Sequence, residues 1–170
     1  RSATVREYAA TALHRHADAH CIADLLEAIR TLRREETEKK KDFGEVIDTL
    51  CSAVIQTSAG TNLALLLEGL ADADARVRRT CISALGRLGD AAAVVPLIET
   101  FEHPRRGMPM ELRRELVKVL GALGDARAIA PLLRAGVTVA APALGPLKAL
   151  EAVPELMAAL EQALGLALFT

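Results

Sequence analysis

Two stretches of the chain decide its fold, because the second nearly repeats the first. Residues 84–99 read ALGRLGDAAAVVPLIE and residues 119–134 read VLGALGDARAIAPLLR, which is a step of 35 residues. A step of this size is typical of proteins in which each repeat is one pair of helices. A copy this short cannot bury its apolar surface alone, so we expect stacked copies that share a continuous core.

Weaker copies extend the repeat over most of the chain. Stepping back 31 residues from Val77 gives Val46, and stepping back 72 residues gives Val5. Between those two older copies lies the charged stretch RREETEKKKD, which we expect to lengthen the second helix of the first copy. We predict one domain over residues 1–170, with units at 5–30, 46–70, 77–102, 112–135 and 137–160 and a charged insertion at 31–45.

Each unit is predicted to consist of a helix A, a tight turn and a helix B. Gly89 is placed to end helix A in the left-handed conformation, and Asp90 is placed to cap the start of helix B. The apolar residues recur at steps of three and four, as a helix with one buried face requires. In the best copy they are Val77, Cys81, Ala84, Leu85 and Leu88 in helix A, and Val94, Leu97, Ile98 and Phe101 in helix B.

These units predict an all-α fold, a right-handed α–α superhelix of about five antiparallel helix pairs without strands. Gly124 is expected to repeat the role of Gly89. In such a stack we expect the B helices to line the concave side. The turns are predicted at residues 17–18, 58–60, 89–90 and 124–125.

The stretch VRRTCISALGRLGDAAAVVPLIETF, residues 77–101, resembles the HEAT-like repeat of the subgroup seen in phycobilisome lyases and many bacterial proteins. The resemblance implies an α-helical solenoid. It is shared by bilin lyases, a deoxyhypusine hydroxylase, a class of DNA glycosylases and scaffolds that bind other proteins. A fold shared so widely does not choose among these functions.

Composition limits the classes of partner. Hydrophobic residues make up 51% of the chain and aromatic residues 2%, which suits closely packed helices. The net charge of −1 gives no overall attraction to nucleic acid or to an anionic membrane. The longest uncharged run, residues 135–147, is too short to span a bilayer and contains Pro142 and Pro146. The opening RSATVREY has no initiator Met, so we expect a piece of a longer protein.

The cysteines indicate a reducing compartment. Cys21, Cys51 and Cys81 form no CxxC pair, and each lies in an apolar helical pattern. We therefore predict buried free thiols and a cytoplasmic location.

A histidine cluster at the first predicted turn is the candidate for a metal site. The stretch LHRHADAHC, residues 13–21, contains His14, His16, Asp18, His20 and Cys21. Zinc needs three or four converging ligands. Because the alignment places His16 at the end of helix A and His20 at the start of helix B, these two are weak candidates. We predict surface histidines and no metal.

No catalytic residue is predicted. Deoxyhypusine hydroxylases of the HEAT-like type hold iron with His-Glu dipeptides, and no His-Glu pair occurs in this sequence. The corresponding positions read Arg78-Arg79 and Arg113-Arg114. The sequence also lacks a nucleophile in a glycine-rich elbow and a phosphate-binding glycine motif. We expect a non-catalytic protein without a cofactor.

A basic group consists of Arg105, Arg106, Arg113 and Arg114 around the loop RGMPM. It offers a site for phosphate or for an acidic partner. Nucleic-acid binding is not favoured, because it needs a longer positive stripe and aromatic platforms. We instead expect Arg78 and Arg113 to pair with aspartates of a neighbouring unit, such as Asp90.

Equivalent B-helix positions suggest a binding surface. Glu27, Glu68, Glu99 and Arg134 each lie two residues after a core leucine, and a step of two residues turns a side chain away from the core. We predict a charged column on helix B that binds another protein, as in a scaffold or adaptor. The alternatives are a bilin lyase-like subunit that handles a chromophore and a nucleic-acid-binding module.

Overall fold

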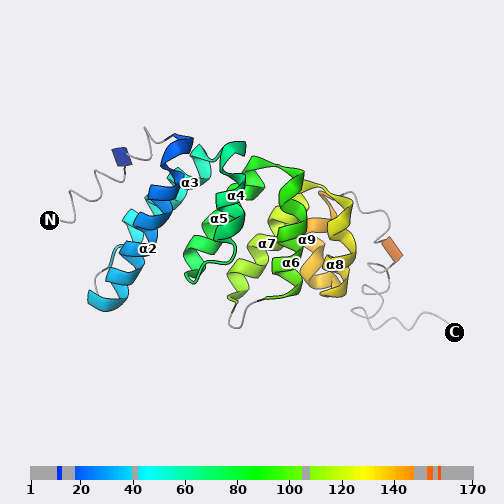
Figure 1. Cartoon of the computed structure of the whole chain (residues 1–170). Coiled ribbons are helices and arrows are strands. Elements are labelled where there is room, and N and C mark those ends of the chain that lie inside the picture. Colours follow the sequence, from blue (N-terminus) through cyan, green and yellow to red (C-terminus); the bar gives the residue numbers. More distant parts are fainter. Residues whose placement is uncertain are drawn as a thin grey trace. The chain divides into compact units, whose positions relative to one another are not determined.

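The computed structural model describes residues 11–12, 18–39, 42–104, 108–147, 153–154 and 157. These residues form helices, turns and loops, with no strand among them (Figure 1). The predicted all-α class is therefore confirmed. The chain divides into two compact units, Arg1–Asp90 and Ala91–Thr170. One domain over residues 1–170 stays a prediction, as do the copies at 5–30 and 137–160, parts of which lie outside the described residues.

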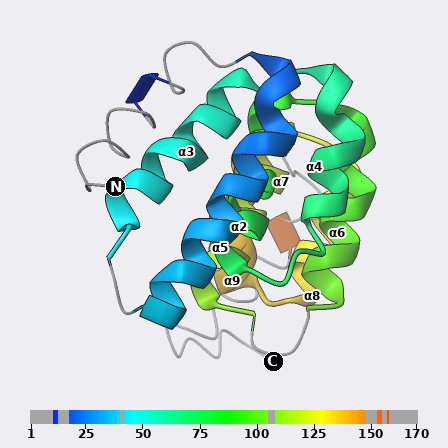
Figure 2. The same ribbon diagram turned by 60° about the vertical axis from the view of Figure 1, so that its left-hand side comes forward.

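Helix pairs build the first unit. Helix α2 packs along α3, and α5 packs against both α3 and α4 (Figure 2). The buried residues at this junction include Leu26, Ile47, Leu66 and Leu85, all fully shielded from solvent. The elements are η1 (Ala19–Cys21), α2 (Ile22–Lys39), α3 (Gly44–Thr57), η2 (Gly60–Asn62), α4 (Leu63–Gly69) and α5 (Ala75–Leu88), where η marks a 3₁₀ turn.

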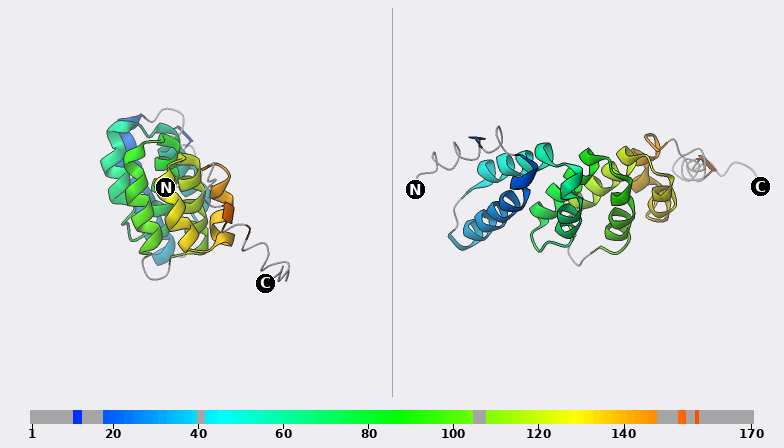
Figure 3. Two further views of the ribbon diagram at one scale, coloured as in Figure 1. Left: turned by 90° about the vertical axis from the view of Figure 1, so that its right-hand side faces the viewer. Right: turned by 45° about the horizontal axis from the view of Figure 1, so that its top comes forward.

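The second unit continues the alternation. Helix α7 packs against α6 and α9, and α8 packs against α9 (Figure 3). The elements are η3 (Ala91–Ala93), α6 (Val94–Glu102), α7 (Met110–Leu123), η4 (Ala126–Ala128), α8 (Ile129–Arg134) and α9 (Val137–Leu144). By their place in the repeat, α3, α5, α7 and α9 are A helices, and α2, α4, α6 and α8 are B helices.

The glycine turns form as predicted. Gly89 and Gly124 follow α5 and α7, and each has φ of 70° in the left-handed region. The N–H of Gly89 donates to the carbonyl of Leu85 at 3.1 Å, and that of Gly124 donates to Gly121 at 3.2 Å. Helix α3 ends at Thr57 and η2 begins at Gly60, which confirms the turn at residues 58–60. Residue 17, part of the first predicted turn, lies outside the described residues.

A 3₁₀ turn precedes each described B helix, and this was not predicted. Asp18 and Asp125 cap this turn rather than the α-helix itself, since each carboxylate accepts from the N–H two residues later. The α-helical parts of α4, α6 and α8 therefore contain only 7, 9 and 6 residues. The capping aspartate of these two copies therefore stands one 3₁₀ turn before the α-helical part, and the capping role of Asp90 stays a prediction.

Helix α2 is longer than the other B helices, at 18 residues, as the charged stretch predicts. Lys39 Nζ lies 3.2 Å from Glu35 Oε2 at the i, i+4 spacing, and Arg33 pairs with Glu36 one turn earlier. Each such pair stabilises a solvated helix end by about 0.2–0.5 kcal/mol.

Two glycines allow close packing between helices. A Cβ atom on Gly121 of α7 would lie 2.7 Å from the Cα atom of Ala143 in α9. A Cβ atom on Gly69 of α4 would overlap the Sγ atom of Cys81 in α5. Both sites leave no room for a larger residue, because cores at native density contain few voids.

Across the described residues, no single helix has the length and hydropathy needed to cross a membrane. Residues 44–57 and 60–69 reach these values only when taken together, across a bend of 115°.

Candidate functional site

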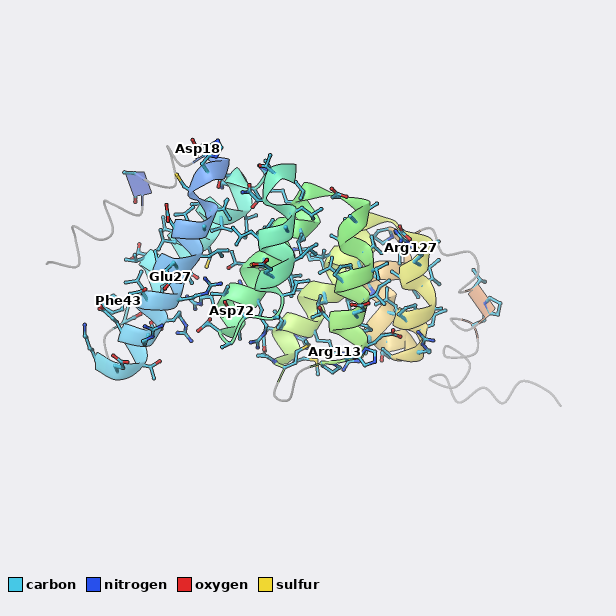
Figure 4. All side chains as sticks on the ribbon, viewed as in Figure 1. Asp18, Glu27, Phe43, Asp72, Arg113 and Arg127 are labelled. Carbon is cyan, nitrogen blue, oxygen red and sulfur yellow. The ribbon has the colours of Figure 1, made fainter. Side chains whose placement is uncertain are left out.

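The predicted acidic positions of the first unit are exposed on B helices. Glu27 lies on α2 with 63% of its side chain exposed, and Glu68 lies exposed on α4. Glu27 Oε2 is 3.3 Å from Arg30 Nη1, and Arg30 Nε is 2.7 Å from Asp72 Oδ2 (Figure 4). The charge of Glu27 is therefore shared with a network, while Glu68 projects from its helix.

The second unit presents the other two positions in the same way. Glu99 is exposed on α6, and Arg134 is exposed on α8 with 68% of its side chain accessible. Arg134 pairs with Glu102 of α6. The leucines two residues earlier are all buried, namely Leu25, Leu66, Leu97 and Leu132. Because the four charged residues are divided between two units, a continuous column remains a prediction.

Arg78 and Arg113 lie on A helices and contact a backbone segment and an aromatic ring. Arg78 Nη1 donates to the carbonyls of Asp72 at 2.7 Å and Ala73 at 2.9 Å. The Arg113 guanidinium carbon lies 5.0 Å from the centre of the Phe101 ring. The contacts of these two cations are backbone carbonyls for Arg78 and an aromatic face for Arg113, and a ladder with aspartates such as Asp90 stays a prediction.

Arg105 and Arg106 of the predicted basic group lie outside the described residues. Arg114 is exposed on the first turns of α7, and its neighbour Arg113 is half-buried. The Nε atom of Arg113 is buried and has no hydrogen-bond partner in the described part of the chain. The structure therefore presents half of the predicted group, as a pair of cations on α7.

Ion pairs between α2 and the α4–α5 turn were missed by the sequence analysis. Besides Arg30 and Asp72, Arg33 Nε lies 3.2 Å from Asp74 Oδ2. Asp74 Oδ1 also accepts from the N–H of Arg76 at 2.7 Å, and so caps α5. An aspartate just before an apolar helical stripe is a recognised start signal, which would have identified Asp74 from the sequence.

A compact charged turn leads into α8. Arg127 Nε and Nη2 donate to the two carboxylate oxygens of Asp125 at 2.9 and 2.7 Å, and the N–H of Arg127 donates at 2.9 Å. These bonds, chiefly those of the side chain, lower the pKa of Asp125 from 3.8 to about 2. Arg127 Nη2 also reaches the carbonyl of Ala91 at 3.4 Å.

The histidine cluster gives no metal geometry in the part that can be described. His14 and His16 lie outside the described residues, and His20 is exposed on η1. Asp18 accepts from the N–H of His20 at 2.9 Å and from Cys21 Sγ at 3.5 Å. Over the described ranges, no group of three His, Cys, Asp or Glu side chains is placed to hold a metal ion.

The three cysteines are free thiols that differ in burial. Cys81 is fully buried, and burial raises its pKa to about 12. Cys51 is half-buried, and burial also raises its pKa. Cys21 is half-buried as well. The prediction of buried thiols is therefore confirmed for Cys81 and is wrong in degree for the other two, because they lie at helix faces that no neighbour covers completely.

Comparison with known families agrees with this geometry. A family model described as HEAT repeats matches residues 63–138, and one described as PBS lyase HEAT-like repeat matches residues 139–162. No curated protein matches the chain. The two family matches together span residues 63–162, more than half of the sequence. The chain is an all-α solenoid and belongs to the HEAT-like repeat proteins of the phycobilisome lyase type.

Proposed function

We propose that the chain is a non-catalytic scaffold module that binds another protein through the surface of its B helices. The observation that carries this proposal is the two-sided character of those helices. On each of α4 and α6 a leucine is buried, and a glutamate two residues later, Glu68 or Glu99, is exposed. Each unit therefore presents an exposed glutamate on a B helix whose leucine is in the core, and repeat proteins use helix faces of this kind for binding.

The charges of this surface favour a basic segment of the partner. Exposed glutamates steer an oppositely charged partner during its approach, and salt screens the effect within about 10 Å at 0.1 M ionic strength. Since Glu27 already pairs with Arg30, Glu68 and Glu99 are the stronger contributors to attraction.

Site-specific crosslinking tests the proposal. A photo-reactive amino acid replaces Glu68 or Glu99 in the full chain, and the matched controls carry it at Asp48 or Arg79, which are exposed on A helices. In extracts of the source cells, we expect one protein to be crosslinked from both B-helix positions and from neither control. Equal crosslinking from all four positions would contradict the assignment of the face.

Association kinetics then test the charges. The triple variant Glu27→Gln, Glu68→Gln, Glu99→Gln should bind the crosslinked partner more slowly at low salt, with its melting temperature kept. The matched control replaces three other exposed glutamates, Glu38, Glu45 and Glu111, by Gln. If both triple variants associate at the same rate as the unmodified chain, the glutamates only keep the helices soluble.

A chromophore-handling role is the second candidate. It is favoured by the match of residues 139–162 to a repeat described as PBS lyase HEAT-like. The test is co-expression with a bilin, followed by visible absorption of the purified protein. A bilin band in stoichiometric amount would support this candidate over the scaffold, and a colourless protein would support the scaffold.

A further inference from the structure

An apolar groove lies between α7 and α9, on the A helices of the second unit. Its volume is about 460 Å³. Val117 of α7 is buried at its base, and Val139 of α9 is half-buried. Met110, with 59% of its surface exposed, and Pro142 form its outer edge. Large apolar surface left open in this way is a common mark of an interaction site.

Among the described residues, three cations and no acidic residue line this groove. Arg113, Arg114 and Lys118 all project from α7, and Arg114 and Lys118 are one helical turn apart and exposed. At the spacing i, i+4 both reach the same side of the helix. An occupant with carboxylates along one edge would meet all three charges.

Arg113 adds a second reason to expect an anion. Its guanidinium lies over the Phe101 ring, and within the described residues it forms no ion pair with a carboxylate. A carboxylate placed beside an unpaired guanidinium gains a charge-assisted hydrogen bond, about twice as strong as a neutral one.

We propose that this groove is a docking site for an acidic amphipathic helix of a partner protein. The apolar side chains of the partner helix pack on Val117, Val139 and Met110, and the carboxylates of that helix face Arg113, Arg114 and Lys118. An amphipathic helix in a groove between two helices is a recurring mode of recognition, with anchors at i, i+3, i+4 and i+7. The site lies on A helices, so it is separate from the B-helix surface and does not depend on it.

The exposed residues beside the groove favour a protein segment as its occupant. Small-molecule sites enclose 70–90% or more of a ligand's surface, which usually requires a concave pocket. Here Met110 and Pro142 are both exposed, so a protein segment can contact them as well as the interior of the groove. Met and Arg are also enriched in protein interfaces, where flexible Met adapts to its partner.

The probe is a short synthetic helix of Leu and Glu, with Leu at the i, i+3, i+4 and i+7 positions. Its scrambled sequence and a version with Lys in place of Glu are the peptide controls. Fluorescence anisotropy measures binding to the full chain, and ¹³C-methyl NMR of Met110 locates it. We expect only the Leu–Glu helix to bind, with a shift of the Met110 methyl signal and weaker affinity at high salt.

Two variants separate charge from shape. The double variant Arg114→Glu, Lys118→Glu should bind the probe about tenfold more weakly, since two exposed pairs become repulsive. Thr138 is exposed and lines the groove, so Thr138→Trp should fill it and abolish binding without a change of charge. The matched control is Arg34→Glu, Arg79→Glu, which reverses two exposed arginines of the first unit. Circular dichroism and melting confirm that each variant is folded.

Four results would overturn the proposal. The first is that the Leu–Glu helix binds no better than its scrambled form. The second is that it binds the Arg114→Glu, Lys118→Glu variant as tightly as it binds the control variant. The third is that laurate, a small apolar carboxylate, shifts the Met110 signal while the peptide does not. The fourth is that sedimentation shows the free chain to be a dimer and the Arg114→Glu, Lys118→Glu variant to be a monomer, which would make a second copy the occupant.

Discussion

Gly124 carries the conformation that separates helix A from helix B in its copy. Its φ of 70° lies where a residue with a Cβ atom is disfavoured, and a β-branched residue most of all. We expect Gly124→Val to lower the free energy of unfolding by about 1 kcal/mol or more, as measured by urea denaturation. Gly60→Val is the control, because a Cβ atom there meets nothing within 4 Å and its φ is not in the left-handed region. Equal stability of the two variants would contradict the assigned role of Gly124.

Asp125 makes the stability of its turn depend on pH. Its pKa is lowered from 3.8 to about 2 by the bonds from Arg127, so the folded chain binds the proton more weakly than the unfolded chain. The stabilisation is complete above the unfolded pKa and is lost as the pH falls toward 2. We expect Asp125→Asn to be less stable than the unmodified chain at pH 6, with the difference shrinking between about pH 4 and pH 2.

Urea denaturation of both chains across this pH range measures the difference. NMR titration of the Asp125 carboxyl checks its cause, and a midpoint near 3.8 would show that the bonds from Arg127 do not persist in solution.

The contact between α7 and α9 depends on a glycine. Because a Cβ atom on Gly121 would lie 2.7 Å from Ala143 Cα, Gly121→Ala forces backbone to move. Overpacking of this kind costs about 1–3 kcal/mol, so we expect a loss of that size in thermal or urea unfolding. Gly145→Ala is the control in the same unit, since φ of −61° there is ordinary and a Cβ atom meets nothing within 4 Å. A neutral Gly121→Ala would mean that the two helices are farther apart.

Regular elements were predictable because their signals are local. The apolar spacing predicted helices α5, α6 and α7, and Gly89 and Gly124 predicted the turns that follow α5 and α7. The 3₁₀ turns were not predictable from that spacing, since three residues are too few to show a period. The pair of Arg30 with Asp72 joins residues 42 positions apart, and only packing brings them together.

The groove was unpredictable for a related reason. Its α9 side belongs to the most decayed copy, where Pro142 and a low density of large apolar residues hide the repeat. Arg113 and Arg114 were predicted as candidate binding residues, but as a loop group with Arg105 and Arg106. Their relation to Val139 appears only once α7 and α9 are packed together.

At the scale of the molecule, the division into two compact units predicts how far the effect of a destabilising substitution spreads. In repeat proteins each copy contacts mainly its neighbours, so local destabilisation stays local. We expect Gly69→Ala to speed amide hydrogen exchange chiefly in α4 and α5, and Gly121→Ala to do so chiefly in α7 and α9. Mass-spectrometric exchange measures both. If either substitution raises exchange equally along the described helices, the chain unfolds as one cooperative body.

The glycine turns that follow α5 and α7 have the same sequence, and this affects how the gene of such a repeat protein can change in length. Residues 88–90 and 123–125 both read Leu-Gly-Asp, and both glycines have φ of 70°. The carboxylate of Asp125 bonds to a residue two positions later, so the turn is completed within its own copy. Unequal recombination between the DNA segments that encode these turns would add or delete one copy of 35 residues and rejoin the chain at the same tripeptide. Evolution can therefore change the repeat number here without having to build a new helix end.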